Sequence, residues 1–141
     1  MLGAHECLVN QQYKICIFML HQALEQSCIV LIRVQIAYRS EFHNLHRLLY
    51  LCNSFSNLPG KIFLSNSPED ERLFDVLVKS YSGARYGDHF SVEQGDAHLL
   101  YKKIASFVTL AKQMCEEKIV KLENEAALYK QVTQEREVQN G

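Results

Sequence analysis

The most constraining feature of this sequence is a long N-terminal segment in which nothing interrupts a helix. Residues 4–37 contain neither proline nor glycine, and their apolar side chains recur at helical spacing. Between Ile15 and Ile36 these side chains cover more than one stripe, so the helix must be surrounded by other elements. We therefore predict a central bundle helix, with a bend near Asn10 to Gln12 that separates a short first helix.

Three further segments repeat the helical period, and turn or capping residues separate them. Asn57 to Gly60 has turn chemistry, so residues 57–67 are predicted to form the longest loop. Ser67 followed by Pro68 is typical of a helix start, and the stretch from Ser91 to Gln94 resembles a capping box. The expected helices cover residues 43–55, residues 68–86, and the chain from residue 92 onward.

No segment of alternating polarity is long enough to form a sheet, so the predicted fold class is all-α, a four- to five-helix antiparallel bundle. A chain of 141 residues has room for one such core. The apolar stripe of the last helix thins after Ile119. We therefore assign residues 1–122 to the bundle and residues 123–141 to a charged C-terminal helix extension or tail.

Composition excludes several classes of function. A formal net charge of −1 provides no global positive field, so a general binder of duplex DNA is not expected. The apolar run from Ile15 to Ile36 is interrupted by polar side chains, which favours a core helix over a membrane span. The five cysteines include no CxxC pair, which is typical of reduced thiols and a cytoplasmic protein. His43 and His46 lack cysteine ligands at metal spacing, so no metal or other cofactor is expected.

Three local patterns, in this order along residues 4–120, resemble the HEPN domain. They are the run from Phe18 to Glu25, then His43-Asn44-Leu45 followed by Leu48-Leu49, and finally Leu73-Phe74 leading to Tyr81 and Ala84-Arg85-Tyr86. The resemblance implies a helical bundle like the substrate-binding subunit of a nucleotidyltransferase. It also implies a homodimer, a nucleotidyltransferase partner in cis or in trans, a nucleotide or RNA ligand, and a toxin–antitoxin-type setting.

Candidate site residues lie on three of the predicted helices. His21 and Glu25 are four residues apart and share a helix face, with Gln22 on the neighbouring stripe. These three residues form either a satisfied polar layer inside the bundle or the wall of a nucleotide cleft. His43, at a predicted helix start, either caps that helix or contributes to nucleotide binding.

Tyr81, Arg85 and Tyr86 form the second group of candidates for nucleotide binding. Tyr81 and Arg85 are four residues apart and share a helix face. An arginine between two phenol rings suits a phosphate beside a stacked base, whereas the alternative is an ion pair with a carboxylate on a neighbouring helix.

Many HEPN proteins resemble metal-independent endoribonucleases, in which an arginine and a histidine are separated by about four to six residues. Here the candidate catalytic pair is Arg85 and His89, and the spacing is one residue short. A second match, Arg39 with His46, crosses a predicted loop and is interpreted as coincidence. The sequence therefore favours a non-catalytic domain that binds a nucleotide or docks a nucleotidyltransferase. The alternatives are a toxin-like endoribonuclease, or a structural dimerisation module with the helix from Glu116 as a connector.

Overall fold

The computed structural model describes residues 1–86 and 90–140, without the side chains of residues 82–86. Within this part the chain forms six helices and their connections and contains no strand, which confirms the predicted all-α fold. The helices are α1 (Leu2–Val9), α2 (Tyr13–Ile36), α3 (Leu45–Cys52), α4 (Leu58–Lys61), α5 (Pro68–Tyr86) and α6 (Gln94–Asn140).

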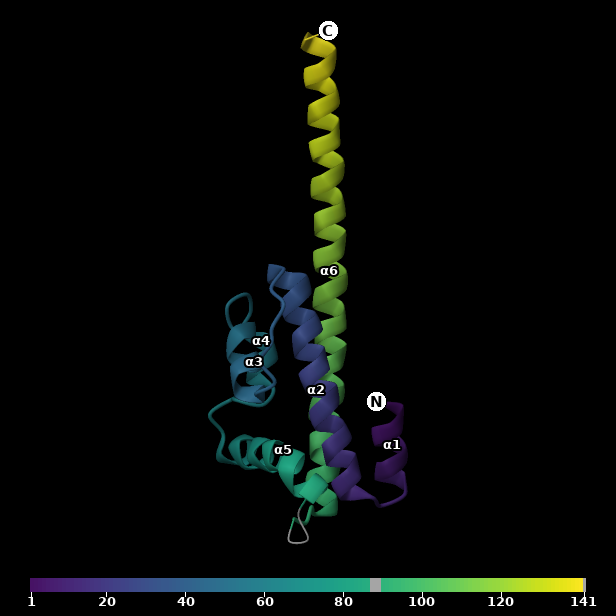
Figure 1. The fold of residues 1–141 in the computed structure, drawn as a ribbon, viewed down its shortest axis with the longest axis vertical. Helices are drawn as coiled ribbons and strands as arrows, with labels where there is room; N and C mark the ends of the chain where they lie inside the picture. Colours follow the sequence, from purple (N-terminus) through teal and green to yellow (C-terminus); the bar gives the residue numbers. More distant parts are fainter. Residues whose placement is uncertain (87–89, 141) are drawn as a thin grey trace.

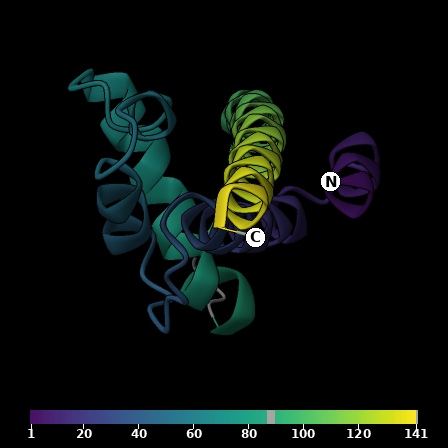
Figure 2. The ribbon, with the colours of Figure 1, turned by 90° about the horizontal axis from the view of Figure 1, so that it is seen from above.

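Helix α2 is the central element, and it contacts α1, α3, α5 and α6. Figure 1 shows α1 on one side of the α2–α6 pair and α3, α4 and α5 on the other. Figure 2, which looks along α6, shows the same division. By length and composition alone α2 could cross a membrane, yet 50% of its most apolar window is buried in this bundle, as expected of a core helix. Its buried apolar residues are Cys16, Ile17, Leu20, Leu24, Cys28, Leu31 and Ile32.

A tight turn separates α1 from α2 at the bend that the sequence predicts. Gln11 adopts a positive φ of 60°, which reverses the chain direction between the two helices. Helix α2 therefore runs back alongside α1 (Figure 1). Helix α1 buries Ala4 and Leu8. The first predicted helix is therefore a separate element that covers one end of the α2–α6 pair.

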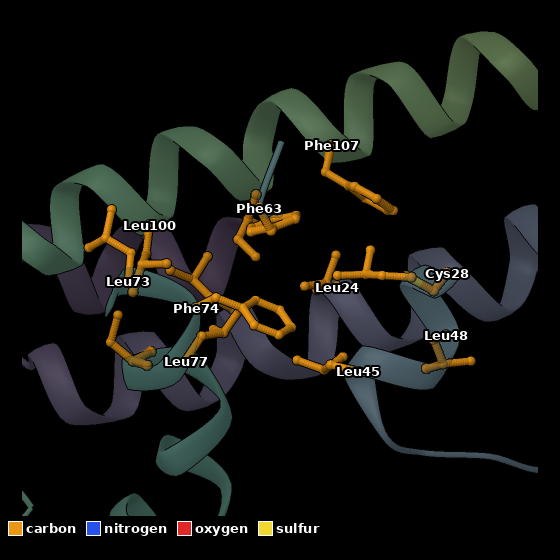
Figure 3. Packing of buried hydrophobic residues seen from close by; sticks show 14 of the residues in the cluster. Leu24, Cys28, Leu45, Leu48, Phe63, Leu73, Phe74, Leu77, Leu100 and Phe107 are labelled. Atoms are coloured by element: carbon orange, nitrogen blue, oxygen red, sulfur yellow. The ribbon is translucent and has the colours of Figure 1, made fainter. Parts of the chain in front are cut away.

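The core between α5, α2 and α6 depends on one aromatic side chain that follows α4. The ring of Phe63 lies 5.9 Å from the ring of Phe74 in α5 and 5.8 Å from the ring of Phe107 in α6. All three residues are buried. Figure 3 shows them beside leucines from α2, α3, α5 and α6. The connection between α3 and α5 therefore contributes directly to the core.

Three predicted boundaries differ from the structure. The loop predicted over residues 57–67 contains the single turn of α4, which brings the following Phe63 into the core. Helix α3 begins at Leu45, and the Asn44 side chain caps it by accepting a hydrogen bond from the Arg47 amide at 3.1 Å. Helix α6 begins at Gln94, so Ser91 lies three residues before the first helical residue and not at the N-cap position that the sequence predicts.

A polar cluster, called here the α5–α6 clamp, joins the start of α5 to the start of α6. The Arg72 guanidinium donates to both carboxylate oxygens of Asp96, at 2.7 and 2.8 Å, and to Glu69 at 2.7 Å. Lys103 lies 2.7 Å from Asp70 and donates to the Ile62 carbonyl at 2.9 Å. Bidentate pairing gives a fixed orientation as well as energy. The clamp therefore sets where α6 starts relative to α5.

Helix α6 extends far beyond the bundle (Figure 1). It contains 47 residues, which corresponds to a length of about 70 Å. Near the end of α2, the Gln35 side chain donates a hydrogen bond of 3.0 Å to the Met114 carbonyl of α6. From Glu116 to Asn140 nearly every residue is exposed. The boundary predicted between residues 122 and 123 lies within this continuous helix.

Candidate functional site

A cleft of about 600 Å³ opens between α2, the chain that precedes α3, and α5. We call it the α2–α5 cleft. Its floor includes the buried residues His21, Glu25 and Leu45. Its rim is formed by exposed polar side chains together with one phenol ring: Gln22, Gln26, His43, Asn44, His46 and Tyr81. A cleft of this size with a few convergent polar groups is typical of small-molecule sites.

Glu25 lies between two imidazoles at the floor of the cleft. Its Oε1 atom is 2.5 Å from Nδ1 of His43, and its Oε2 atom is 3.8 Å from Nδ1 of His21. Helical spacing places His21 beside Glu25, as the sequence predicts. His43 arrives from the chain after α2, which turns back at Ala37 with a φ of 54°. The predicted capping role of His43 is wrong, because Asn44 caps α3 and His43 pairs with Glu25 instead.

His21 is the least satisfied polar group of the cleft. Only 6% of the residue is exposed, and its Nδ1 atom is buried without a hydrogen-bond partner among the residues that the structure describes. Burial lowers the pKa of His21, an effect that the nearby Glu25 carboxylate partly opposes. The imidazole is therefore neutral near pH 7, and its Nδ1 atom can accept or donate one hydrogen bond, depending on the tautomer.

Helix α5 places Tyr81 against His21 at the edge of the cleft. The Tyr81 ring lies 5.4 Å from the His21 ring and 6.2 Å from the Phe18 ring, which is stacked with it. Because 46% of Tyr81 is exposed, its ring still presents surface toward solvent. The predicted candidates His21, Gln22, Glu25, His43 and Tyr81 therefore line one cleft.

Three other predicted site residues lie outside this description. The backbones of Arg85 and Tyr86 belong to the last turn of α5, but their side chains are not described, and His89 lies wholly outside the described residues. The Arg85 and His89 pair proposed for catalysis thus stays a prediction. Arg85 follows Tyr81 by four residues, so its Cα atom lies one turn further along the same face of α5.

Sequence reasoning did not name Gln26, Asn44 and His46 as site residues, although all three line the cleft. Gln26 follows Gln22 by four residues, and this helical spacing was an available signal. His46 packs against Phe74, with its ring centroid 4.6 Å from the phenyl ring in a T-shaped arrangement. No sequence pattern places His46 opposite α2, because that proximity depends on how α3 packs.

The described lining offers hydrogen-bonding side chains and an aromatic ring for stacking. It offers imidazoles, side-chain amides, one phenol and one carboxylate, and it includes no Lys or Arg. Across the part of the chain that the structure describes, no three His, Cys, Asp or Glu side chains gather as metal ligands. These groups suit the edges and faces of a heterocyclic base, since amides and imidazoles both donate and accept hydrogen bonds.

The sequence was compared with known protein families and with curated proteins. No curated protein matches the chain. Residues 3–115, which include most of α1, all of α2 to α5, the first part of α6 and every described residue that lines the cleft, match the HEPN domain family. The match ends close to the point where α6 leaves the bundle. The chain therefore belongs to the HEPN domain family, as the patterns around His21, His43 and Tyr81 predict.

Proposed function

We propose that this HEPN domain binds a nucleotide, with the base inserted into the α2–α5 cleft. The observation that carries the proposal is the position of His21. Its buried Nδ1 atom has no described partner, and it lies at the floor of an open cleft of about 600 Å³. An unsatisfied buried polar atom costs stability unless a ligand satisfies it. A nucleobase brings hydrogen-bonding groups on a flat apolar frame and suits that position.

The groups around His21 support the choice of a base over other ligands. The Tyr81 ring borders the cleft and offers a surface on which a base can stack. The side-chain amides of Gln22 and Gln26 also line the cleft, one helical turn apart on α2. Amides of this kind can donate to and accept from the edge of a base. An anionic sugar phosphate would find no cation in the described lining, and no three metal-ligating side chains gather there among the described residues.

Arg85 is the proposed partner of the phosphate. Because the described lining includes no Lys or Arg, a phosphate in the cleft itself would be poorly compensated. Arg85 follows Tyr81 by one helical turn along α5. A base stacked beside Tyr81 would then direct its phosphate toward α5's last turn, where a guanidinium can bind two oxygens. The nucleotidyltransferase partner and the toxin–antitoxin setting implied by the resemblance stay predictions.

Thermal unfolding of the purified chain with nucleosides and nucleotides tests this proposal. A ligand that binds only the folded state stabilises it, so a nucleotide at ten times its Kd should raise the Tm by about 4 °C. Tyr81→Ala should remove the shift for nucleosides and nucleotides alike. Arg85→Ala should remove only the extra shift that the phosphate provides, because the base site remains intact.

The matched control is Tyr50→Ala, which removes an equally large phenol from a position that is 78% exposed and does not line the cleft. It should leave the nucleotide-induced shift unchanged. The proposal fails if no nucleoside or nucleotide raises the Tm at millimolar concentration. It also fails if Tyr81→Ala retains the full shift, since binding would then occur elsewhere on the molecule.

A further inference from the structure

Helix α6 carries a regular stripe of mostly apolar side chains that begins at Cys115, which packs against the bundle core, and continues along the projecting part of the helix. Its residues alternate in steps of four and three, which is the spacing of coiled-coil core positions. Ile119 is 46% exposed, Leu122 is 47% exposed and Tyr129 is 73% exposed. A single helix that leaves such side chains in water is only marginally stable. We call these residues the α6 stripe: Cys115, Ile119, Leu122, Ala126, Tyr129 and Thr133.

The α6 stripe begins inside an apolar groove of the bundle. This groove of about 390 Å³ lies between α2, at Ser27 and Val30, and α6, at Val108, Cys115 and Ile119. Nearer the start of α6, helix α1 covers the neighbouring surface, and its His5 ring lies 5.8 Å from the Tyr101 ring. Figure 1 shows that α1 runs beside only the first part of α6. The apolar surface is thus continuous from the bundle into the projecting helix.

The charges beside the stripe specify what covers it. In a heptad with Ile119 and Ala126 at position a, Lys118 and Glu125 occupy position g, whereas Glu123 and Lys130 occupy position e. In a parallel two-stranded coiled coil, each g side chain faces the e side chain of the next heptad on the other helix. Lys118 would therefore face Glu123 of the second copy, and Glu125 would face its Lys130. Both pairs join opposite charges.

We propose that the α6 stripe binds the α6 stripe of a second copy of this chain, in a parallel coiled coil over residues 115–136. An antiparallel arrangement pairs e with e and g with g. Centred on the stripe, it would bring Glu123 against Glu123 and Glu125 against Glu125, which is repulsive. In the parallel homodimer the stripe is buried, and both flanking pairs join opposite charges.

This interface lies almost entirely outside the region that matches the HEPN family, which ends at residue 115. The inference is therefore independent of the proposed nucleotide site. Ala126 and Thr133 bury little apolar area at two of the core positions. We accordingly expect a dimer that dissociates on dilution, and its test requires a concentration series.

Sedimentation equilibrium of the full 141-residue chain, with charge-reversed variants, tests the proposal. Lys118→Glu and Glu123→Lys should each weaken dimerisation roughly tenfold, because each turns two attractive pairs per dimer into repulsive ones. The double variant Lys118→Glu/Glu123→Lys should dimerise like the wild type. An equimolar mixture of the two single variants should form heterodimers, since every facing pair is then attractive again.

Neighbouring residues on the projecting helix provide the matched control. Ile119→Glu places a charge in the stripe and should abolish dimerisation, whereas Val120→Glu, at a position that is 54% exposed and faces away from the stripe, should not. Both variants should retain the bundle's unfolding transition, because these side chains lie outside its core. A wild-type chain that stays monomeric throughout the series would falsify the proposal. Failure of the double variant to recover, or equal weakening by Val120→Glu, would also overturn it.

Discussion

The α5–α6 clamp and the α2–α5 cleft are both made of polar side chains between helices, but they differ in how completely those side chains are paired. In the clamp, Arg72 binds both carboxylate oxygens of Asp96, and Lys103 binds both Asp70 and a backbone carbonyl. In the cleft, Glu25 pairs closely with His43, whereas His21 has a buried nitrogen without a described partner.

This difference in pairing indicates that the clamp stabilises the fold, whereas the cleft has an unsatisfied group that a ligand can bind. A buried charge with a bidentate partner is compensated within the folded chain, so the clamp needs no other molecule. A buried nitrogen without a hydrogen-bond partner lowers the stability of the folded chain, because it has lost its hydrogen bonds to water. The contrast therefore predicts that substitutions in the clamp lower stability, while substitutions at His21 lower binding.

The largest expected effect is on the clamp. Asp96→Ala should lower the free energy of unfolding by about 2 kcal/mol, because Arg72 loses the partner that joins α5 to α6. Urea unfolding measures this change. The matched control is Asp75→Ala, whose carboxylate pairs with Lys79 on an exposed face of α5 and should contribute less than about 0.5 kcal/mol. Equal effects of the two substitutions would show that the clamp is an ordinary surface ion pair.

A smaller effect of opposite sign is expected in the cleft. His21→Leu should leave the free energy of unfolding unchanged or raise it by about 1 kcal/mol, since the substitution removes a buried atom without a described partner. The same variant should lose the Tm shift that nucleotides produce. Urea unfolding and ligand titration of one preparation measure both quantities. A loss of stability larger than about 1 kcal/mol would show that His21 is satisfied in the folded chain.

The smallest expected effect is on the pH dependence of the free energy of unfolding, which should differ between the cleft and the clamp. Burial lowers the pKa of His21 below its ordinary value of 6.5, so only the unfolded chain takes up this proton at first as the pH falls. The free energy of unfolding should therefore decrease below pH 6.5, and this decrease should be smaller in His21→Leu by the part that His21 contributes. The matched measurement is urea unfolding of both proteins between pH 7 and pH 5. Identical pH profiles would contradict the assignment.

The clamp should respond only in stronger acid. The hydrogen bonds from Arg72 to Asp96 and from Lys103 to Asp70 hold the pKa values of both carboxyl groups below their ordinary value of 3.8. The unfolded chain therefore binds protons first, and the stability that these pairs contribute is present above pH 3.8 and lost below it. Asp96→Ala should reduce the acid-induced loss of stability in that range.

Sequence patterns predict a side chain's contacts well where both partners lie on the same helix. The i, i+4 spacing of His21 and Glu25 places the two residues together in any helix, and the structure confirms that proximity. The pairing of His43 with Glu25 is a contact across 18 residues, so reasoning from local helix starts left capping and nucleotide binding as alternatives and did not predict this pairing. Phe63 likewise lies in a segment with turn residues, and only its contacts with Phe74 and Phe107 explain the turn of α4.

The sequence by itself determines that this chain is helical, that α2 is central, and that it belongs to the HEPN family, because helical period and local motifs are properties of neighbouring residues. Tertiary structure alone decides that His43 meets Glu25, that the cleft beside Tyr81 is open, and that Asp96 meets Arg72. These pairings join segments far apart in the chain. They depend on how the helices pack around α2, and helical periodicity carries no information about that packing.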